Sequence, residues 1–289
     1  MEEIYKVDFI EHKNYKKYLF TDEQKQLICD LYQECGSTVT IGKMFGVNHH
    51  TIAKILKEFK IECTGKSRRR YGLNENYFDD IDTPNKAYIL GFLYADGSNN
   101  RDKSTISMSL EENDFKILDA IRNEIGSEKP LEYLDYSCKH DFGYTYKNQY
   151  RLLMFSSHMC DILTKHGMMP NKSLKLEFPK WLNKDLYRHF IRGYFDGDGS
   201  VSRGKKRTNF VLTITSTYNF CNDLVDIVHK EIGVNGHIYD ASNHNGITKV
   251  FATSGASQTK KFLDWIYDDA ELFLQRKYDR YVDYFYSVA

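Results

Sequence analysis

The feature that most constrains the fold is a ten-residue pattern that occurs twice. Residues 88–97 read Tyr-Ile-Leu-Gly-Phe-Leu-Tyr-Ala-Asp-Gly, and residues 190–199 read Phe-Ile-Arg-Gly-Tyr-Phe-Asp-Gly-Asp-Gly. Each copy is an apolar run that closes on Asp-Gly, with small residues four positions apart. Residues four apart share one face of a helix, and a face without side chains lets a second helix approach closely. The pattern therefore predicts two helices packed against each other.

Each predicted helix carries a carboxylate at its C-terminal end, Asp96 in the first copy and Asp198 in the second. The C-terminus of a helix bears partial negative charge, and two carboxylates placed close together repel each other. A divalent cation would remove both penalties, because Mg²⁺ binds carboxylates, backbone carbonyls and phosphates through oxygen. The sequence therefore predicts a metal site shared by the two helices.

These two motifs resemble the signature motifs of the LAGLIDADG homing endonucleases in their single-chain, two-repeat form. The resemblance covers roughly residues 80–289. A single Asp-Gly pair after an apolar run ends many helices and turns, so the specificity of the resemblance lies in the duplication. The resemblance implies an α+β fold of two αββαββα repeats, whose antiparallel sheets form a saddle over duplex DNA. It also implies hydrolysis of one phosphodiester in each DNA strand.

The resemblance also implies roles for individual residues. The expected catalytic residues are Asp96, Asp198, Lys172 and Lys277, and the expected metal ligands are Asp96, Asp198 and the backbone carbonyls of Ala95 and Gly197. Mg²⁺ or Mn²⁺ is the expected cofactor. An alternative for each lysine is a phosphate-positioning or surface role.

The first motif departs from the commonest family pattern at Tyr94, where an acid often stands, whereas Asp196 keeps the acid in the second motif. In the family this position is usually not a metal ligand, so Tyr94 is not expected to inactivate the site. Two unequal halves imply a long, non-palindromic target and a protein that acts as a monomer.

The duplication extends beyond the motifs. Alternating apolar and polar residues at 105–110 and 209–215 predict half-buried strands, and amphipathic helices that end in Glu-Ile-Gly follow in both halves. We assign the first repeat to residues 84–180 and the second to residues 181–289. A free antiparallel face can enter the major groove of DNA. We place ten residues on that face, each of which could equally belong to an ordinary solvated sheet: Ser98, Asn99, Arg101, Ser107, Ser109, Ser200, Ser202, Arg203, Thr213 and Thr215.

Residues 1–66 form a separate predicted module. Helix starts near residues 21 and 37, followed by a Gly-Val-Asn turn at 46–48 and a third helix, match a helix-turn-helix. The last helix would present four residues to bases or phosphates: His49, His50, Thr51 and Lys54. The alternative is a small helical bundle with a solvated basic face.

A predicted linker, residues 67–83, begins with a basic run and then turns acidic. Its basic part contains Arg68, Arg69 and Arg70, which are expected to follow the phosphate backbone of DNA. A solvated hinge is the alternative for this segment.

Composition adds limits rather than a function. The net charge of the 289 residues is zero, so DNA binding would require positive charge gathered on one surface. No apolar stretch reaches the roughly 18 residues of a membrane helix, and the N-terminus lacks a secretory pattern. The six cysteines contain no Cys-x-x-Cys pair, which argues against zinc and fits a reducing compartment. We expect a cytoplasmic protein, nucleoid-associated or phage-encoded, with an organelle left open.

Three functions remain open at this stage. The first is a DNA endonuclease. The second is a non-cleaving DNA-binding transcription regulator, because some bacterial transcription factors combine this fold with a helix-turn-helix. The third is an intron RNA maturase. Retention of both motif aspartates and both lysines favours the nuclease. An intein is not expected, because the chain starts with Met and ends in Tyr-Ser-Val-Ala.

Overall fold

The computed structural model divides into two compact units, residues 1–70 and 71–289, which are considered separately. It describes residues 5–12, 15–35, 37–61, 71–136, 140–141, 144–169, 172–204, 210–241 and 248–287. No helix in these described ranges is long and apolar enough to cross a membrane.

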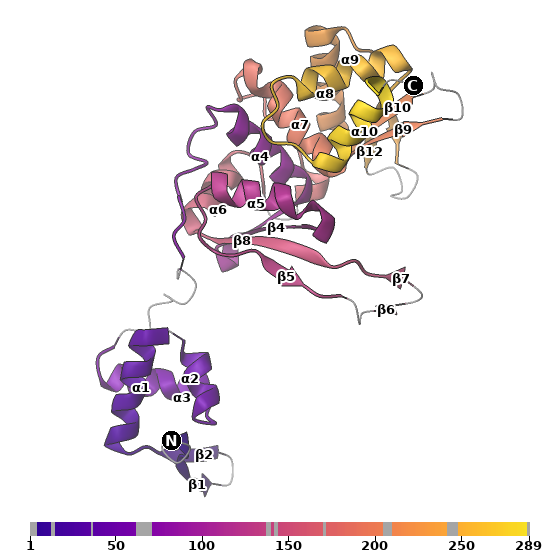
Figure 1. Cartoon of the computed structure of the whole chain (residues 1–289). Coiled ribbons are helices and arrows are strands. Elements are labelled where there is room, and N and C mark those ends of the chain that lie inside the picture. Colours follow the sequence, from indigo (N-terminus) through magenta and orange to yellow (C-terminus); the bar gives the residue numbers. More distant parts are fainter. Residues whose placement is uncertain are drawn as a thin grey trace. The chain divides into compact units, whose positions relative to one another are not determined.

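The N-terminal unit consists of a hairpin and three helices (Figure 1). Its elements are β1 (Asp8–His12), β2 (Tyr15–Leu19), α1 (Asp22–Cys35), α2 (Thr38–Met44) and α3 (His49–Glu58). The side chains of Ser37 and Asn48 accept backbone N–H groups at the starts of α2 and α3, which fixes where these helices begin. Gly46 takes the left-handed conformation, with φ 63°, in the turn between them. The predicted helices are present, whereas the hairpin within residues 1–20 was not anticipated.

The second unit contains two repeats with the same order of elements. The first comprises α4 (Pro84–Asp96), β3 (Gly97–Asn100), β4 (Thr105–Glu111), α5 (Phe115–Glu124), β5 (Glu132–Leu134), β8 (Gln149–Phe155) and α6 (Ser157–Lys165), with short β6 (His140–Asp141) and β7 (Tyr144–Thr145) between β5 and β8. The second comprises α7 (Tyr187–Asp198), β9 (Gly199–Arg203), β10 (Phe210–Ser216), α8 (Tyr218–Ile232), β11 (His237–Asp240), β12 (Lys249–Ser254), α9 (Ala256–Tyr267) and α10 (Gln275–Phe285). The αββαββα repeat is therefore present twice, and α10 follows the second copy.

Each repeat builds one antiparallel four-stranded sheet. The strand orders are β3-β4-β8-β5 and β9-β10-β12-β11, so corresponding strands occupy corresponding places. Burial alternates strictly along β4 and β10, because every second side chain faces the helices. In Figure 1, α5 and α6 lie on one side of the sheet that contains β4 and β8. The α+β fold class predicted from the sequence is confirmed.

The two motif helices form the centre of the second unit. Residues 87–94 of α4 are all buried, so this helix is enclosed on every side. It packs against α7, whose residues 189–196 are likewise all buried. Both helices lie in one continuous apolar core that reaches into both sheets.

The predicted linker is only partly a connection between units. Residues 71–83 belong to the second unit, where Phe78 is fully buried and Tyr77 is 6% exposed. The Tyr77 hydroxyl donates a hydrogen bond to Glu124 at the end of α5. The acidic stretch therefore packs onto the first repeat rather than bridging the two units.

Candidate functional site

The motif helices touch at their backbones, as the spacing of small residues predicts. A Cβ atom added to Gly91 would lie 2.0 Å from the carbonyl oxygen of Phe190, and one added to Gly193 would lie 1.9 Å from that of Tyr88. Neither distance leaves room for a side chain. The glycines thus fix how closely α4 and α7 approach and where their C-terminal ends lie.

Asp96 and Asp198 are the last residues of these helices, and both are exposed. A Cβ on Gly197 would lie 2.3 Å from Cβ of Ala95 and 3.1 Å from Oδ2 of Asp96, so the two helix ends are in contact. Although its side chain reaches solvent, partial desolvation by the surrounding protein and then the negative charge of Asp198 raise the pKa of Asp96 to about 6. Burial also raises the pKa of Asp198. Desolvation therefore disfavours the charged form of both acids, and the charge of Asp198 adds to this effect at Asp96; a bound cation would relieve it.

A lysine lies against each helix end. Nζ of Lys172 donates to the carbonyl of Ala95 at 2.8 Å. Nζ of Lys277 donates to the carbonyls of Phe195 and Gly199, both at 2.6 Å, and to that of Gly197 at 3.3 Å. Ala95 and Gly197 lie in the last turns of α4 and α7, where backbone carbonyls lack partners within the helix, so each amine bonds to one such carbonyl. The four predicted catalytic residues are brought together, and the two carbonyls predicted as metal ligands accept lysine hydrogen bonds.

The surroundings of the lysines lower their affinity for protons. Burial lowers the pKa of Lys172, and the nearby Asp198 and Asp96 oppose that shift. Burial lowers the pKa of Lys277 further, to about 8. The environments of the two lysines therefore differ between the two halves of the site.

The donors at this site fit a hard divalent cation. The two helix ends supply two carboxylates and two backbone carbonyls, all of them oxygen ligands. Across the part of the chain that the structure describes, no group of three or more His, Cys, Asp or Glu side chains could hold a metal ion. Mg²⁺ typically binds through one or two carboxylates and completes its shell with substrate phosphates and water. A site of this composition therefore suits Mg²⁺ in the presence of a phosphate-containing substrate.

Asp196, the extra acid of the second motif, is a buried structural residue with an exposed fraction of 1%. Its carboxylate accepts hydrogen bonds from the hydroxyls of Tyr88 and Tyr267, at 2.9 and 3.0 Å, and from the backbone N–H of Leu274 at 2.8 Å. Burial raises the pKa of Asp196, while these donors counteract the shift. Asp196 therefore connects α7 to α4 and to the segment that precedes Lys277.

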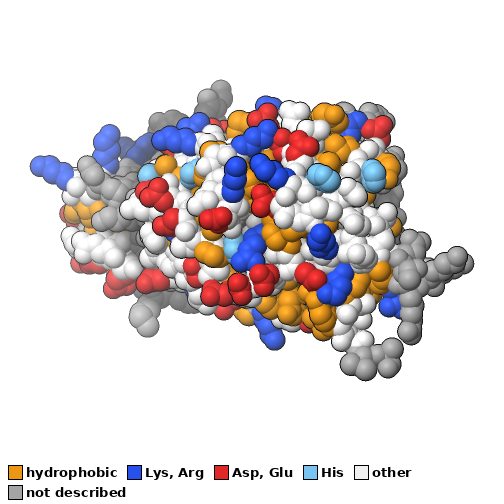
Figure 2. All heavy atoms as spheres, turned by 90° about the horizontal axis from the view of Figure 1, so that it is seen from above, with side chains coloured by type: hydrophobic (Ala, Val, Ile, Leu, Met, Phe, Trp, Pro, Cys, Tyr) orange, Lys and Arg blue, Asp and Glu red, His pale blue; other side chains and the backbone are white. Residues whose placement is uncertain are grey.

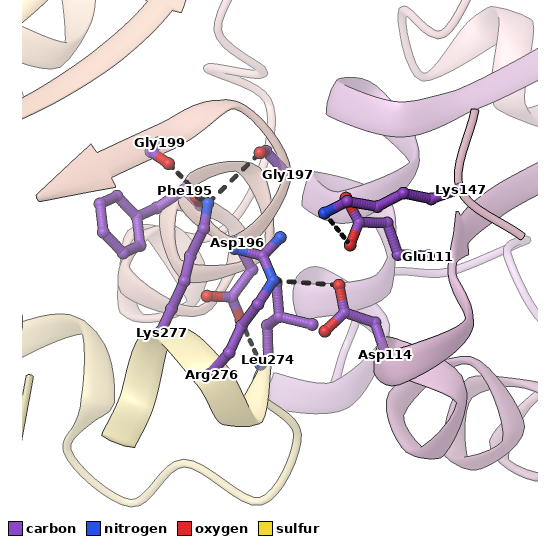
Figure 3. A network of polar contacts seen from close by, with 10 residues as sticks. All are labelled: Glu111, Asp114, Lys147, Phe195, Asp196, Gly197, Gly199, Leu274, Arg276 and Lys277. Carbon is purple, nitrogen blue, oxygen red and sulfur yellow. Dashed lines mark hydrogen bonds and ion pairs between the residues drawn. The ribbon is translucent and has the colours of Figure 1, made fainter. Parts of the chain in front are cut away.

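Arg276 is a residue near the site that sequence reasoning missed. In Figure 3, Arg276 and Lys277 leave the same helix, α10, but Lys277 points to the carbonyls of α7 while Arg276 reaches Asp114 of the first repeat. Its Nε lies 3.0 Å from Oδ2 of Asp114, which is nearly buried. The positive charge of Arg276, after those of Lys277 and Lys172, opposes the rise in the pKa of Asp96. The signal in the sequence was an arginine beside the predicted lysine, but its partner lies 162 positions away.

The predicted DNA-facing residues of the sheets fall into two groups. On the face opposite the helices lie seven of them: Ser98, Ser107, Ser109, Ser200, Ser202, Thr213 and Thr215. Contact of these residues with DNA stays a prediction. We call the two surfaces that carry them the open faces of the sheets.

The other three residues lie elsewhere, and our placement of them on the open face is wrong. Asn99 is 5% exposed, and its amide donates to the carbonyls of Cys160 and Met168. Arg101 turns toward α6, where its guanidinium pairs with Asp161. Arg203 pairs in register with the buried Phe210 and lies over the ring of Tyr284. In each case the alternation of the strand or the loop that follows it directs the side chain to the helical side.

In the N-terminal unit, the predicted recognition helix presents polar residues at its start. His49, His50 and Lys54 of α3 are exposed, and Thr51 is half-buried. Ile52, Ile55 and Leu56 on the other side of α3 are buried in the core of the unit. The predicted contacts at Arg68, Arg69 and Arg70 lie outside the described residues. The amphipathic arrangement of α3 is therefore as predicted, and its contact with DNA stays a prediction.

Positive charge is not gathered on the face of the molecule seen in Figure 2. There, described Lys and Arg side chains lie interspersed with Asp and Glu. This distribution agrees with the zero net charge of the sequence. Any DNA contact on that face would have to rely on individual side chains rather than on a field of one sign.

Comparison with known proteins gives a family match for the second repeat. Residues 185–266 match the model of the LAGLIDADG-like domain. A stretch of 129 residues is 30% identical to the DNA-directed RNA polymerase subunit Rpo1C of Methanocaldococcus jannaschii, which covers 45% of this chain but only 14% of that subunit.

Two solved structures are similar at low sequence identity. The homing endonuclease I-WcaI bound to its DNA recognition sequence gives a TM-score of 0.49 with 13% identity, over 66% of this chain and 85% of that one. Full-length DUF199/WhiA from Thermatoga maritima gives a TM-score of 0.44 with 17% identity, over 75% and 66%. The family match lies on the second αββαββα repeat, and the first repeat has the same topology and pairs with it through α4 and α7. Residues 185–266 therefore carry a LAGLIDADG-like domain, and it pairs with a first repeat of the same topology.

Proposed function

We propose that the chain is a DNA endonuclease that hydrolyses one phosphodiester in each strand of a long, non-palindromic target, with Mg²⁺ or Mn²⁺ as cofactor. The observation that carries this proposal is the meeting of Asp96 and Asp198 at the ends of two helices in backbone contact, with a lysine against each end. A protein that only binds DNA gains nothing from paired acids beside a phosphate, because carboxylates repel the DNA backbone.

Asp96 and Asp198, with the carbonyl oxygens of Ala95 and Gly197, would hold the divalent ion. Bound there, the ion would stabilise the charge that develops on the phosphate and lower the pKa of the attacking water. Because each carbonyl accepts a lysine hydrogen bond, the amines would have to share or release it when a cation binds.

Lys172 and Lys277 would supply positive charge beside the scissile phosphates. A lysine is a compact cation that can offset negative charge as it develops in the transition state. Both amines are held at the helix ends by carbonyl oxygens, so little side-chain entropy remains to be lost when the phosphate arrives. The close approach at Gly91 and Gly193 gives the site its rigidity, since the two acids cannot move apart without separating α4 from α7.

The open faces of the two sheets would read the target in the major groove, and the N-terminal unit would add a second contact. His49, His50 and Lys54 at the start of α3 would face bases or phosphates. Because one chain contains both halves of the site, we propose that the protein acts as a monomer.

A DNA-binding regulator that does not cut is the second candidate. The observation that favours it is the hydrogen bonding of Lys172 and Lys277, whose amines already bond to the carbonyls of the motif helices. In such a protein the lysines would compensate the two acids permanently, and no metal would be needed.

The deciding experiment exposes a random-sequence plasmid library to the purified protein and Mg²⁺ and sequences any new DNA ends. Staggered double-strand breaks at one long sequence, lost in Asp96→Asn and Asp198→Asn, are expected. Retention of one sequence without breaks, unchanged in these variants, would support the regulator and contradict the nuclease.

A further inference from the structure

The open face of the second sheet lacks fixed charge. Among the described strand residues of β9–β12, none that shares this face is Lys, Arg, Asp or Glu. Its centre consists of small hydroxyl and methyl-bearing side chains, from Val211, Thr213 and Thr215 on β10 to Val250 and Ala252 on β12. Ser200 on β9 lies opposite Thr213 in the register. Its outer strand adds the exposed rings of His237 and Tyr239, which lie opposite Ala252 and Val250. The centre of this surface can offer methyl contacts and single hydroxyl hydrogen bonds.

The open face of the first sheet is different. Ser109 on β4 lies opposite Arg151 on β8, and Arg151 in turn lies opposite Glu132 on β5. Nη2 of Arg151 is 3.1 Å from Glu132, whose carboxylate also binds Lys129. Glu111 at the end of β4 pairs with Lys147. The two faces therefore differ in chemistry although their strands correspond one to one.

We propose that the second repeat recognises a thymine-rich half-site through the methyl groups of its open face. This inference rests on the proposed function, because it assumes that the faces read the major groove. Guanine is most often read there by Arg or Lys, which this face lacks in the described strands, whereas the C5-methyl of thymine packs against apolar groups such as Ala and the Thr methyl. Ser and Thr hydroxyls can pair with any base and do not exclude A·T pairs.

The face is placed so that it can extend from the paired acids along the groove. β9 starts at Gly199, directly after Asp198, and β10 pairs with it. Consecutive side chains on one face of a strand are separated by about 6.6 Å, close to two base-pair steps of about 3.4 Å. Val211, Thr213 and Thr215 can therefore each meet a different base pair.

The test starts with duplexes selected by the full-length protein from a random library, without divalent cation so that binding is measured apart from cutting. One half of the selected site is expected to be rich in thymine. Deoxyuridine is then placed in that half at each thymine, which removes only the C5-methyl. Each contacted methyl should contribute about fourfold to affinity, the value of one buried carbon.

The variant Thr213→Ser assigns the effect to this face, because it removes a methyl and keeps the hydroxyl. At one position, deoxyuridine should weaken binding of the wild-type protein about fourfold but that of Thr213→Ser by less than about twofold. The matched control is Thr105→Ser on the open face of the first sheet. With this variant, deoxyuridine at the same DNA position should still weaken binding about fourfold, because the protein change and the DNA change act on separate contacts.

The outcomes separate this inference from the proposed function. A selected sequence whose binding is insensitive to deoxyuridine in both halves, or equally sensitive with Thr213→Ser, would overturn the inference and leave DNA recognition standing. Failure to select any sequence would overturn both.

Discussion

Replacing Gly193 with alanine should separate the motif helices and disable the paired acids. The added Cβ would lie 1.9 Å from the Tyr88 carbonyl oxygen, whereas ordinary contacts begin at 3.4 Å, so α7 has to move by about 1.5 Å, the difference between these distances. Since the obstacle is backbone, no change of rotamer can relieve it. Overpacking costs about 1–3 kcal/mol, and we expect about 3 kcal/mol or more here. A misplacement of about 1 Å in the acids should lower the cutting rate on the order of 100-fold.

Urea unfolding followed by tryptophan fluorescence reports the stability of the second structural unit, because both tryptophans, Trp181 and Trp265, lie in residues 71–289. Gly255→Ala is the matched control. Gly255 has φ 90° and no atom within 4 Å of an added Cβ, so alanine there incurs only backbone strain, about 1–3 kcal/mol, and moves neither α4 nor α7. If Gly193→Ala loses no more stability than Gly255→Ala and cuts at the wild-type rate, the account of helix contact is refuted.

Three further predictions concern pH, a buried amide and the N-terminal unit. Burial and the neighbouring Arg192 lower the pKa of His189 from 6.5 to about 4. Between these pH values the unfolded chain binds a proton at His189 that the folded chain does not, so the free energy of unfolding should fall by up to about 3 kcal/mol as the pH drops from about 6.5 to 4. Urea titrations of His189→Gln should not show this loss. Asn99→Ala should remove the buried amide that donates to the carbonyls of Met168 and Cys160, of which the latter keeps the Thr164 hydroxyl as a donor. This loss should cost about 1–3 kcal/mol in urea unfolding, yet keep the base preference of DNA selection unchanged. Removing residues 1–70 should weaken DNA binding and reduce its salt dependence in titrations at several salt concentrations while leaving cutting intact; complete loss of cutting on a tightly bound short target would contradict it.

Local patterns were sufficient to predict the elements of the site but not its contacts. The four-residue spacing of Gly91 and Ala95, repeated at Gly193 and Gly197, predicted the helix pair and hence the meeting of the two acids. Alternation likewise predicted the faces of β4 and β10. These features depend on periodicity within one segment, which a sequence displays directly.

The errors arose where a side chain's direction depends on the register of a short strand or on a distant segment. Val201 is buried, and the period of two places Arg203 on the same side, so the direction of Arg203 was available from the sequence. For Asn99 no such signal exists, because Gly-Ser-Asn-Asn at 97–100 contains no apolar residue to set the register. The bond between Arg276 and Asp114 joins the end of one repeat to the other repeat, and no local pattern indicates it.

The motif position that differs between the repeats, Tyr94 in one and Asp196 in the other, has the same structural role in both, although the side chains differ in chemistry. The hydroxyl of Tyr94 donates to the carbonyl of His166, directly after α6. Asp196 accepts from Tyr267 at the end of α9, the corresponding helix, and from Leu274. In both repeats the residue two positions before the exposed aspartate therefore holds the motif helix against the segment that leads to Lys172 or Lys277. This position requires a hydrogen bond to that segment, and either a donor or an acceptor can make it. The first motif can therefore lack an acid at Tyr94 while Lys172 still bonds to the end of α4, as Lys277 does to α7.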